Sequence, residues 1–275
     1  MKLSVHTMST PHLDLLKAIE LYASIGFDGI DLICDNDYRC AITREPSFNR
    51  LKEIKRQTGY YGIPVVALTP YIKEINVADK KRRETAIAEL QKCIDIAAEF
   101  DCKSIRILAG IEPEKNEWED AFNRLVESLQ QLSEYAAKTD LSLNIENHSG
   151  SMAMTAHQTV QIVTSVNKEN VGILYDPANL IIYGSPDYRV SFKQQAEYIR
   201  HVHIKDDNVF EQGGYLPVLM GEGFIPWTEI IPLLKDSGYD GFLSVEYEKR
   251  WHPEILPDPR VGLRHEKEHI INLIK

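Results

Sequence analysis

The sequence predicts a single α/β domain, a (β/α)8 TIM barrel spanning residues 1–275. Three observations predict the barrel. Short apolar, β-branched-rich runs alternate with longer amphipathic stretches, eight such pairs can be counted, and no linker or low-complexity tract interrupts them. Hydrophobic residues make up 43% and charged residues 26% of the chain, which suits a globular protein with a sizeable core. Barrels of this class commonly reach about 250 residues as one domain.

The expected strands are short, and polar turn residues separate them from the expected helices. We expect strands at 3–6, 29–33, 64–68, 104–109, 141–146, 171–175, 202–204 and 242–246, and helices at 12–24, 79–99, 117–138, 155–166, 227–236 and 260–274. Thr10 and Pro11 offer a cap followed by a first-turn proline for the first helix. The related turns GFDG at 26–29 and GYDG at 238–241 each stop a helix before a strand. This echo favours a repeated βα unit.

Charge and composition exclude several classes of partner. The formal net charge of −10 would repel a phosphate backbone, and the densest basic run, KKRR at 80–83, reads as the start of a helix, so we expect no nucleic acid partner. No stretch approaches the roughly 20 apolar residues of a membrane span, and the chain starts without a signal-like apolar region. We expect a cytoplasmic protein with no membrane partner. The four cysteines show no metal or disulfide spacing and are expected to pack as thiols.

Polar side chains end four of the expected strands in the second half of the chain. Glu146, Asp176 and Glu246 are carboxylates, and His203 is an imidazole. In barrels of this type the chemistry gathers at the carboxyl ends of the strands. Three converging carboxylates would repel one another unless a cation lay among them. This oxygen-rich set predicts one divalent metal ion, with manganese favoured and cobalt, magnesium or zinc as substitutes.

Five segments carry a resemblance to a known family: NIENH at 144–148, YDPAN at 175–179, HVHIKD at 201–206, GEGFIPW at 221–227 and GYDGFLSVE at 238–246. They resemble the sugar phosphate isomerase/epimerase branch of the xylose-isomerase-like TIM barrels, whose members include D-tagatose 3-epimerase and inosose isomerases and dehydratases. The resemblance implies that Glu146, Asp176, His203 and Glu246 bind the metal. It also implies that Glu146 and Glu246 are the paired acid/base catalysts of a ketose 3-epimerase.

Such an enzyme removes a proton beside a keto-sugar or sugar-phosphate carbonyl and returns one to the opposite face, so each face needs a base. With one active glutamate the same site would isomerise an aldose and a ketose, and with loss of a β-hydroxyl it would dehydrate. Many ketose 3-epimerases carry a histidine where this chain has Asn179, which cannot titrate. An inosose-type dehydratase or isomerase is therefore the alternative, and a non-catalytic sugar-binding barrel is a distant one.

Further polar residues are expected to contact the substrate rather than the metal. They are His6, Arg106, His148, Asn179, Lys205 and Glu222. For each, an ordinary structural hydrogen bond or ion pair is the competing interpretation. The segment at 248–252 mixes charge with Trp251, whose ring suits a sugar face, although packing against the last helix explains it as well. A homodimer or homotetramer is possible.

Overall fold

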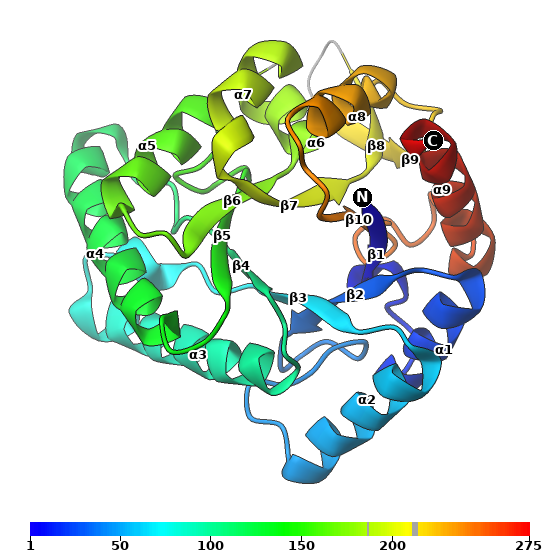
Figure 1. The fold of residues 1–275 in the computed structure, drawn as a ribbon. Helices are drawn as coiled ribbons and strands as arrows, with labels where there is room; N and C mark the ends of the chain where they lie inside the picture. The colour runs from blue at the N-terminus through cyan, green and yellow to red at the C-terminus, as the bar shows by residue number, and fades with distance from the viewer. Residues whose placement is uncertain (186, 211–213) are drawn as a thin grey trace. The chain divides into compact units, whose positions relative to one another are not determined.

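The computed structural model describes residues 1–185, 187–210 and 214–275. Eight parallel strands close into a barrel in the order β1-β10-β7-β6-β5-β4-β3-β2, and helices alternate with them along the chain (Figure 1). This arrangement confirms the predicted (β/α)8 barrel.

The eight barrel strands and six of the described helices lie close to their predicted positions, whereas the helices at 48–61, 177–179 and 188–195 were not predicted. The barrel strands are β1 (Lys2–His6), β2 (Gly29–Cys34), β3 (Val65–Pro70), β4 (Ser104–Ile107), β5 (Ser142–Glu146), β6 (Val171–Tyr175), β7 (Ile199–Ile204) and β10 (Phe242–Val245). The helices are α1 (Leu15–Ile25), α2 (Phe48–Tyr61), α3 (Lys80–Glu99), α4 (Trp118–Ala136), α5 (Ala156–Val166), α6 (Pro177–Asn179), α7 (Tyr188–Gln195), α8 (Trp227–Asp236) and α9 (Pro259–Ile274). Single-turn segments are η1 (Thr7–Ser9), η2 (Glu74–Asn76), η3 (Lys115–Glu117), η4 (Leu180–Gly184) and η5 (Ala196–Tyr198).

The start of α1 differs from its prediction. Asp14 caps this helix, because its Oδ1 accepts a hydrogen bond from the Leu16 backbone nitrogen at 2.9 Å. The expected cap at Thr10 and Pro11 is therefore wrong. The buried Thr10 hydroxyl instead contacts the Tyr22 hydroxyl and the Cys40 thiol, so it is committed to the core.

Two compact units divide the chain: unit 1 comprises residues 1–66 and 202–275, and unit 2 comprises residues 67–201. In unit 1, β1 pairs in parallel with β2 and with β10. Helix α9 lies beside α1 (Figure 1), where Lys267 Nζ donates to the Ile25 carbonyl at 2.7 Å. The two ends of the chain are thus joined within one unit.

Unit 2 is built on the neighbouring strands β4, β5 and β6, which pair in parallel register. Their apolar side chains, including Ile105, Leu143 and Ile173, are fully buried. Helix α5 begins with a capping box, in which Thr155 and Gln158 each satisfy the other's backbone nitrogen. Such caps satisfy backbone groups that the first helical turn leaves without intrahelical partners.

All four cysteines are buried thiols, as the sequence predicts. Burial raises the pKa of Cys40 to about 12, which keeps this thiol protonated and unreactive. None of the helices in the described parts of the chain combines the length and apolar character that crossing a membrane requires.

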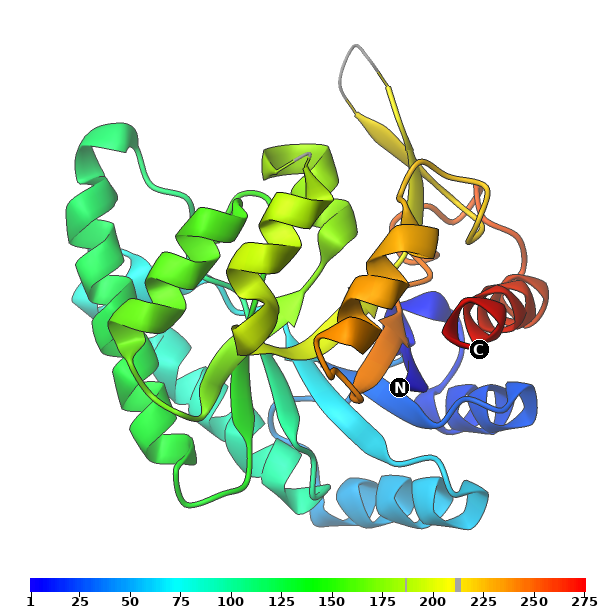
Figure 2. The ribbon, with the colours of Figure 1, turned by 45° about the horizontal axis from the view of Figure 1, so that its top comes forward.

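An antiparallel hairpin that the sequence did not predict follows β7. It consists of β8 (Asp206–Val209) and β9 (Tyr215–Val218), and it extends away from α8 (Figure 2). At its base, the Asp206 carboxylate accepts hydrogen bonds from the backbone nitrogens of Gly221, Gly223 and Ile225 at 2.9, 3.1 and 3.2 Å. A Cβ atom on Gly223 would lie 2.8 Å from the Asp207 backbone nitrogen, so this close approach requires glycine.

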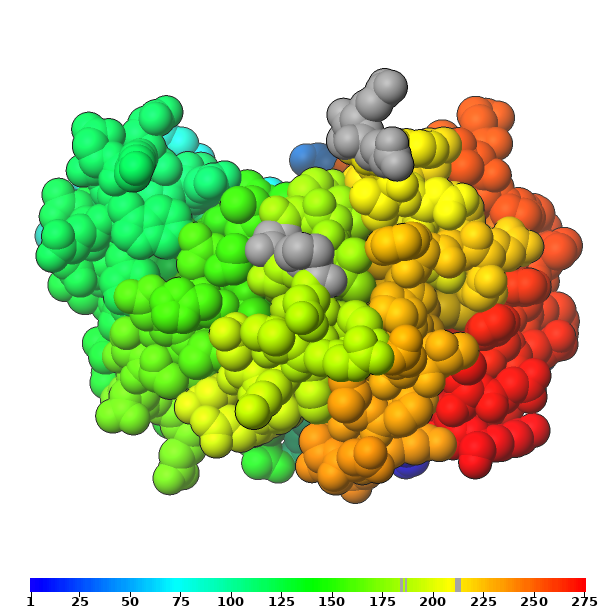
Figure 3. All heavy atoms as spheres, turned by 90° about the horizontal axis from the view of Figure 1, so that it is seen from above, coloured from blue at the N-terminus to red at the C-terminus, as the bar shows by residue number. Residues whose placement is uncertain are grey.

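The segment after β9 is also held by α9. The Met220 backbone nitrogen donates to Glu266 Oε1 at 3.2 Å, and His265 Nε2 lies 3.0 Å from the Met220 carbonyl oxygen. Figure 3 shows this segment, in yellow, against the red atoms of α9. Glu266 is buried, and the burial raises its pKa to about 8.

We expect Glu266→Gln to stabilise the protein increasingly as the pH rises. Between the ordinary glutamate pKa of 4.5 and the folded-state value of about 8, the folded chain holds a proton that the unfolded chain has lost. The contribution of this proton to the free energy of unfolding is therefore fully present below pH 4.5, and it is lost as the pH rises through about 8. Urea unfolding gives the free energy of unfolding of the variant and of the parent protein at pH 5 and at pH 9. The difference between the two proteins should shift in favour of the variant by roughly 3–5 kcal/mol from the lower to the higher pH. Glu268→Gln, on the exposed side of α9, is the control, and an equal pH dependence in both variants would contradict the assignment.

Candidate functional site

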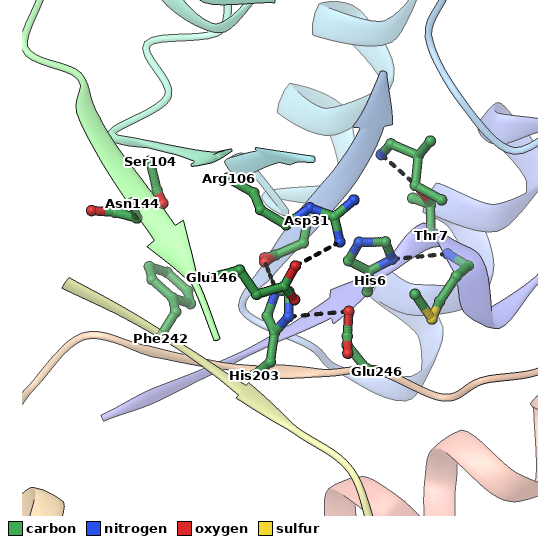
Figure 4. A network of polar contacts seen from close by, with 12 residues as sticks. His6, Thr7, Asp31, Ser104, Arg106, Asn144, Glu146, His203, Phe242 and Glu246 are labelled. Carbon is green, nitrogen blue, oxygen red and sulfur yellow. Dashed lines mark hydrogen bonds and ion pairs between the residues drawn. The ribbon is translucent and has the colours of Figure 1, made fainter. Parts of the chain in front are cut away.

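In unit 1, His203 lies between Glu246, which follows the end of β10, and Asp31, which lies within β2 (Figure 4). Its Nδ1 is 3.0 Å from Glu246 Oε1, and its Nε2 is 3.7 Å from Asp31 Oδ2. Strand register explains the placement: His203 pairs with Ser244, so Glu246 lies just beyond the end of β10. The His6 ring lies edge-on to His203, with their centroids 5.7 Å apart. All of these side chains are buried.

Glu246 is an ionised carboxylate at neutral pH. Burial alone would raise its pKa, but the positive charges of His203 and Lys205 outweigh burial and hold the pKa well below the ordinary glutamate value. Lys205 Nζ lies 2.8 Å from Glu246 Oε2. Both oxygens of this carboxylate therefore have a basic neighbour. The carboxylate holds no proton, so it can accept one but cannot donate one.

Lys205 was predicted to contact substrate, and the structure places its ammonium against two protein carboxylates. Besides Glu246, it lies 3.6 Å from Glu248 Oε1. Glu248, which the sequence did not single out as a site residue, is buried and has His252 Nε2 at 3.8 Å. The sequence carried only a weak signal for it, since Glu248 follows Glu246 by two positions in a loop rather than in a strand.

We expect Lys205→Met to lower the free energy of unfolding by about 3–5 kcal/mol, because it removes the cation that two buried carboxylates share. Urea unfolding at neutral pH measures this loss. Lys103→Met is the matched control, because Lys103 pairs with Asp140 at 2.7 Å while both side chains are largely exposed. Its unfolding midpoint should barely change. Equal losses in the two variants would show that the Lys205 contacts do not stabilise the fold.

In unit 2, Glu146 ends β5 and is paired with Arg106 from β4 (Figure 4). Arg106 NH1 lies 3.4 Å from Glu146 Oε2, and both side chains are almost fully buried. Arg106 NH2 donates to the Pro70 carbonyl at 3.1 Å, and its guanidinium lies 4.2 Å from the Tyr71 ring centroid. The guanidinium is thus fixed on several sides. Because the guanidinium contacts the Glu146 carboxylate, Arg106 positions that carboxylate.

Asp176 follows β6 and caps the short helix α6. Its Oδ1 accepts a hydrogen bond from the Asn179 backbone nitrogen at 2.8 Å. The neighbouring Asn147 supports both residues, since its Oδ1 lies 3.4 Å from the Asp176 nitrogen and its carbonyl accepts from Asn179 Nδ2 at 2.9 Å. Asn147 also donates to Thr159 and to Gln195. The sequence offered no signal for this supporting role beyond adjacency to Glu146.

The remaining predicted substrate residues occupy different environments. His6 is fully buried, and its Nδ1 accepts from the Met8 nitrogen at 3.2 Å. His148 is half-buried, with Nδ1 2.6 Å from the Ser149 carbonyl oxygen. Glu222 is exposed in the segment after β9. The side chain of Asn179 holds the Asn147 backbone, so its donor is used within the protein.

These observations define a class of protein: a closed parallel (β/α)8 barrel whose strand ends carry buried carboxylates with basic partners. The sequence profile of the xylose isomerase-like TIM barrel family matches residues 19–273. The chain belongs to this family.

Individual relatives agree with that assignment. Fructoselysine 3-epimerase from Shigella flexneri is 23% identical over 285 residues, covering 100% of this chain and 98% of the relative. Inosose dehydratase from Lacticaseibacillus casei is 24% identical over 145 residues, which cover 48% of each chain. Among solved structures, a D-tagatose 3-epimerase-like protein superposes with a TM-score of 0.82 at 20% identity, covering 99% of this chain and 98% of that one. The IOLI protein with a bound zinc atom superposes with a TM-score of 0.80 at 22% identity, covering 100% and 98%.

Proposed function

We propose that this chain is a divalent-metal-dependent epimerase or isomerase of keto-sugars or sugar phosphates, with the ketose 3-epimerase type favoured. One observation carries the proposal. Two buried glutamates, Glu146 and Glu246, stand at the carboxyl ends of barrel strands, each with a buried basic partner. Active sites of such barrels form at these strand ends. Fructoselysine 3-epimerase, which matches over the full length, is an epimerase by name.

We propose further that Glu146, Asp176, His203 and Glu246 hold one divalent ion. Each of the four can offer one ligand atom, and all four side chains are buried. Three carboxylates and one imidazole fit a hard divalent cation, so manganese is favoured, with cobalt, magnesium or zinc as substitutes. The solved IOLI structure carries zinc. A bound ion would supply positive charge where an enediolate develops negative charge.

In the proposed reaction, one glutamate accepts the proton from the carbon beside the ketone, and the electron pair of the broken C–H bond moves into the enediolate. The other glutamate, which carries a proton, returns it to the opposite face of the same carbon, so the centre is inverted and no atom is lost. Lys205 keeps Glu246 ionised between turnovers, and Arg106 fixes the direction of the Glu146 carboxylate. His6, Arg106, His148, Asn179, Lys205 and Glu222 remain proposed substrate contacts.

An inosose-type dehydratase or isomerase is the second candidate, because inosose dehydratase matches half of the chain. Offering scyllo-inosose and D-fructose in parallel separates the two, because the second candidate would convert the inosose, with loss of water if it is a dehydratase and without loss of water if it is an isomerase. A sugar-binding barrel without catalysis is the distant alternative, and it would leave both compounds unchanged.

We propose one domain, a cytoplasmic location, a small-molecule sugar or sugar-phosphate substrate without a nucleic acid or membrane partner, and a homodimer or homotetramer. Sedimentation of the purified chain tests the last of these.

The direct test of the function is a screen of keto-sugars with manganese added. D-Fructose, D-tagatose, D-psicose and their phosphates are incubated with the protein, and epimers are separated by chromatography. We expect conversion of at least one of them at carbon 3. Manganese-loaded protein that converts no keto-sugar and no inosose would contradict the proposed class.

A further inference from the structure

Three side chains form a stack in unit 1, which we name the Trp251 stack: Tyr38, Arg250 and Trp251. The guanidinium carbon of Arg250 lies 4.1 Å from the Tyr38 ring centroid and 4.6 Å from the Trp251 ring centroid. Tyr38 belongs to the loop after β2, and the other two belong to the loop after β10. The stack therefore joins two loops that leave the carboxyl ends of barrel strands.

The Trp251 stack is anchored along its length. The Tyr38 hydroxyl donates to the Thr7 carbonyl at 3.1 Å. Arg250 pairs with Asp35 at 3.3 Å, and the Trp251 backbone nitrogen donates to the Glu248 carbonyl at 3.1 Å. An aromatic ring fixed in this way loses little conformational entropy when a ligand binds to it.

Trp251 is exposed although it is anchored. It keeps 51% of its surface accessible, while the Arg250 and Asp35 side chains are only 18% and 19% exposed. The Arg250 guanidinium covers part of the indole, and about half of the Trp251 surface remains accessible to a ligand. Asp35 balances the charge of Arg250, so the stack does not select an anion. A fixed, electrically balanced indole face suits the C–H-rich face of a neutral sugar ring.

A short series of contacts links the stack to the proposed catalytic glutamate. The Trp251 backbone binds the Glu248 carbonyl, the Glu248 carboxylate lies 3.6 Å from Lys205 Nζ, and that ammonium lies 2.8 Å from Glu246. We propose that Trp251 binds a second sugar ring, carried as a glycosyl substituent by the keto-sugar whose carbonyl reacts. This proposal rests on the proposed function, and it defines the substrate class as glycosylated keto-sugars.

The test compares isomaltulose, in which a glucosyl group is attached to fructose, with D-fructose itself. Stacking on an aromatic ring contributes enough to change binding about 3- to 10-fold. We expect Trp251→Ala to lower the ratio of kcat/KM for isomaltulose to that for D-fructose by about this factor. Trp251→Phe keeps an aromatic face and should restore most of the ratio. The control is Tyr60→Ala, at an 80% exposed aromatic near the end of α2 that leads into β3.

A second measurement does not depend on turnover. Methyl α-D-glucopyranoside should protect tryptophan fluorescence from acrylamide quenching in the parent protein and in Tyr60→Ala, and this protection should disappear in Trp251→Phe. If the protein converts no keto-sugar and no inosose but the glucoside still protects Trp251, the proposed function fails and the sugar-binding role of Trp251 stands. An unchanged selectivity ratio in Trp251→Ala, conversion of D-fructose but not of isomaltulose, or an absence of protection would overturn the inference.

Discussion

Glu246→Gln should reduce epimerisation by about 10²–10⁴-fold, the usual contribution of a general base. The amide keeps the size of the side chain and an oxygen that faces His203, but it cannot accept a proton. Glu246 is ionised despite its burial, because His203 and Lys205 hold its pKa well below the ordinary value, so the carboxylate is in the form that can accept a proton. Turnover of the best keto-sugar in the screen measures the loss.

Two controls make this result specific. Glu266→Gln replaces another buried glutamate of unit 1, which binds the Met220 backbone, and it should retain turnover. Solvent-deuterium exchange separates the two glutamates: if each serves one face, Glu246→Gln and Glu146→Gln should each still exchange the substrate proton on one face while failing to invert the centre. Normal epimerisation by either variant would exclude the two-base assignment.

Removal of the metal should abolish turnover, and Asp176→Asn should weaken metal binding and turnover together. Asparagine keeps an oxygen that can accept from the Asn179 backbone, so the cap of α6 is preserved while the negative charge is lost. Metal analysis of the purified proteins should give about one divalent ion per parent chain and clearly less in the variant. Excess manganese should restore part of the rate.

The matched control for that experiment is Asp187→Asn. Asp187 caps α7 through its Oδ1 in the same way, but it lies on the surface of unit 2. Its metal content and turnover should equal those of the parent chain. Full activity of chelator-treated Asp176→Asn protein would rule out a metal-dependent mechanism.

The barrel was predictable because its signals are local. Each strand is a short apolar run, and turns such as the one at Gly26, whose φ of 88° suits glycine, recur at fixed places. Helix α2 gave no such signal, because only two of its residues, Ile54 and Thr58, are buried. The hairpin of β8 and β9 was also missed, because β8, with the sequence DDNV, lacks an apolar run and β9, with the sequence YLPV, contains a proline.

The candidate site was predictable only as a set of residue types at strand ends. The basic partners of the two glutamates come from distant positions in the chain: Lys205 is 41 residues from Glu246, and Arg106 is 40 from Glu146. Barrel register brings them together, and register is a property of paired strands rather than of any one segment. The same limit explains why the sequence could not name the carboxylates that Lys205 and Arg106 pair with.

Asp206 has a consequence for how this chain can diverge in evolution. The Asp206 carboxylate holds the backbone of residues 221–225, and the Asp207 carbonyl accepts a hydrogen bond from the Phe224 nitrogen at 2.9 Å, so the first two residues of the hairpin secure the return of the chain to the barrel. Insertions and deletions farther along the hairpin, between 209 and 216, therefore leave the start of α8 in place. The hairpin is a segment in which length and sequence can vary between descendants, while Asp206 and Gly223 must be inherited together.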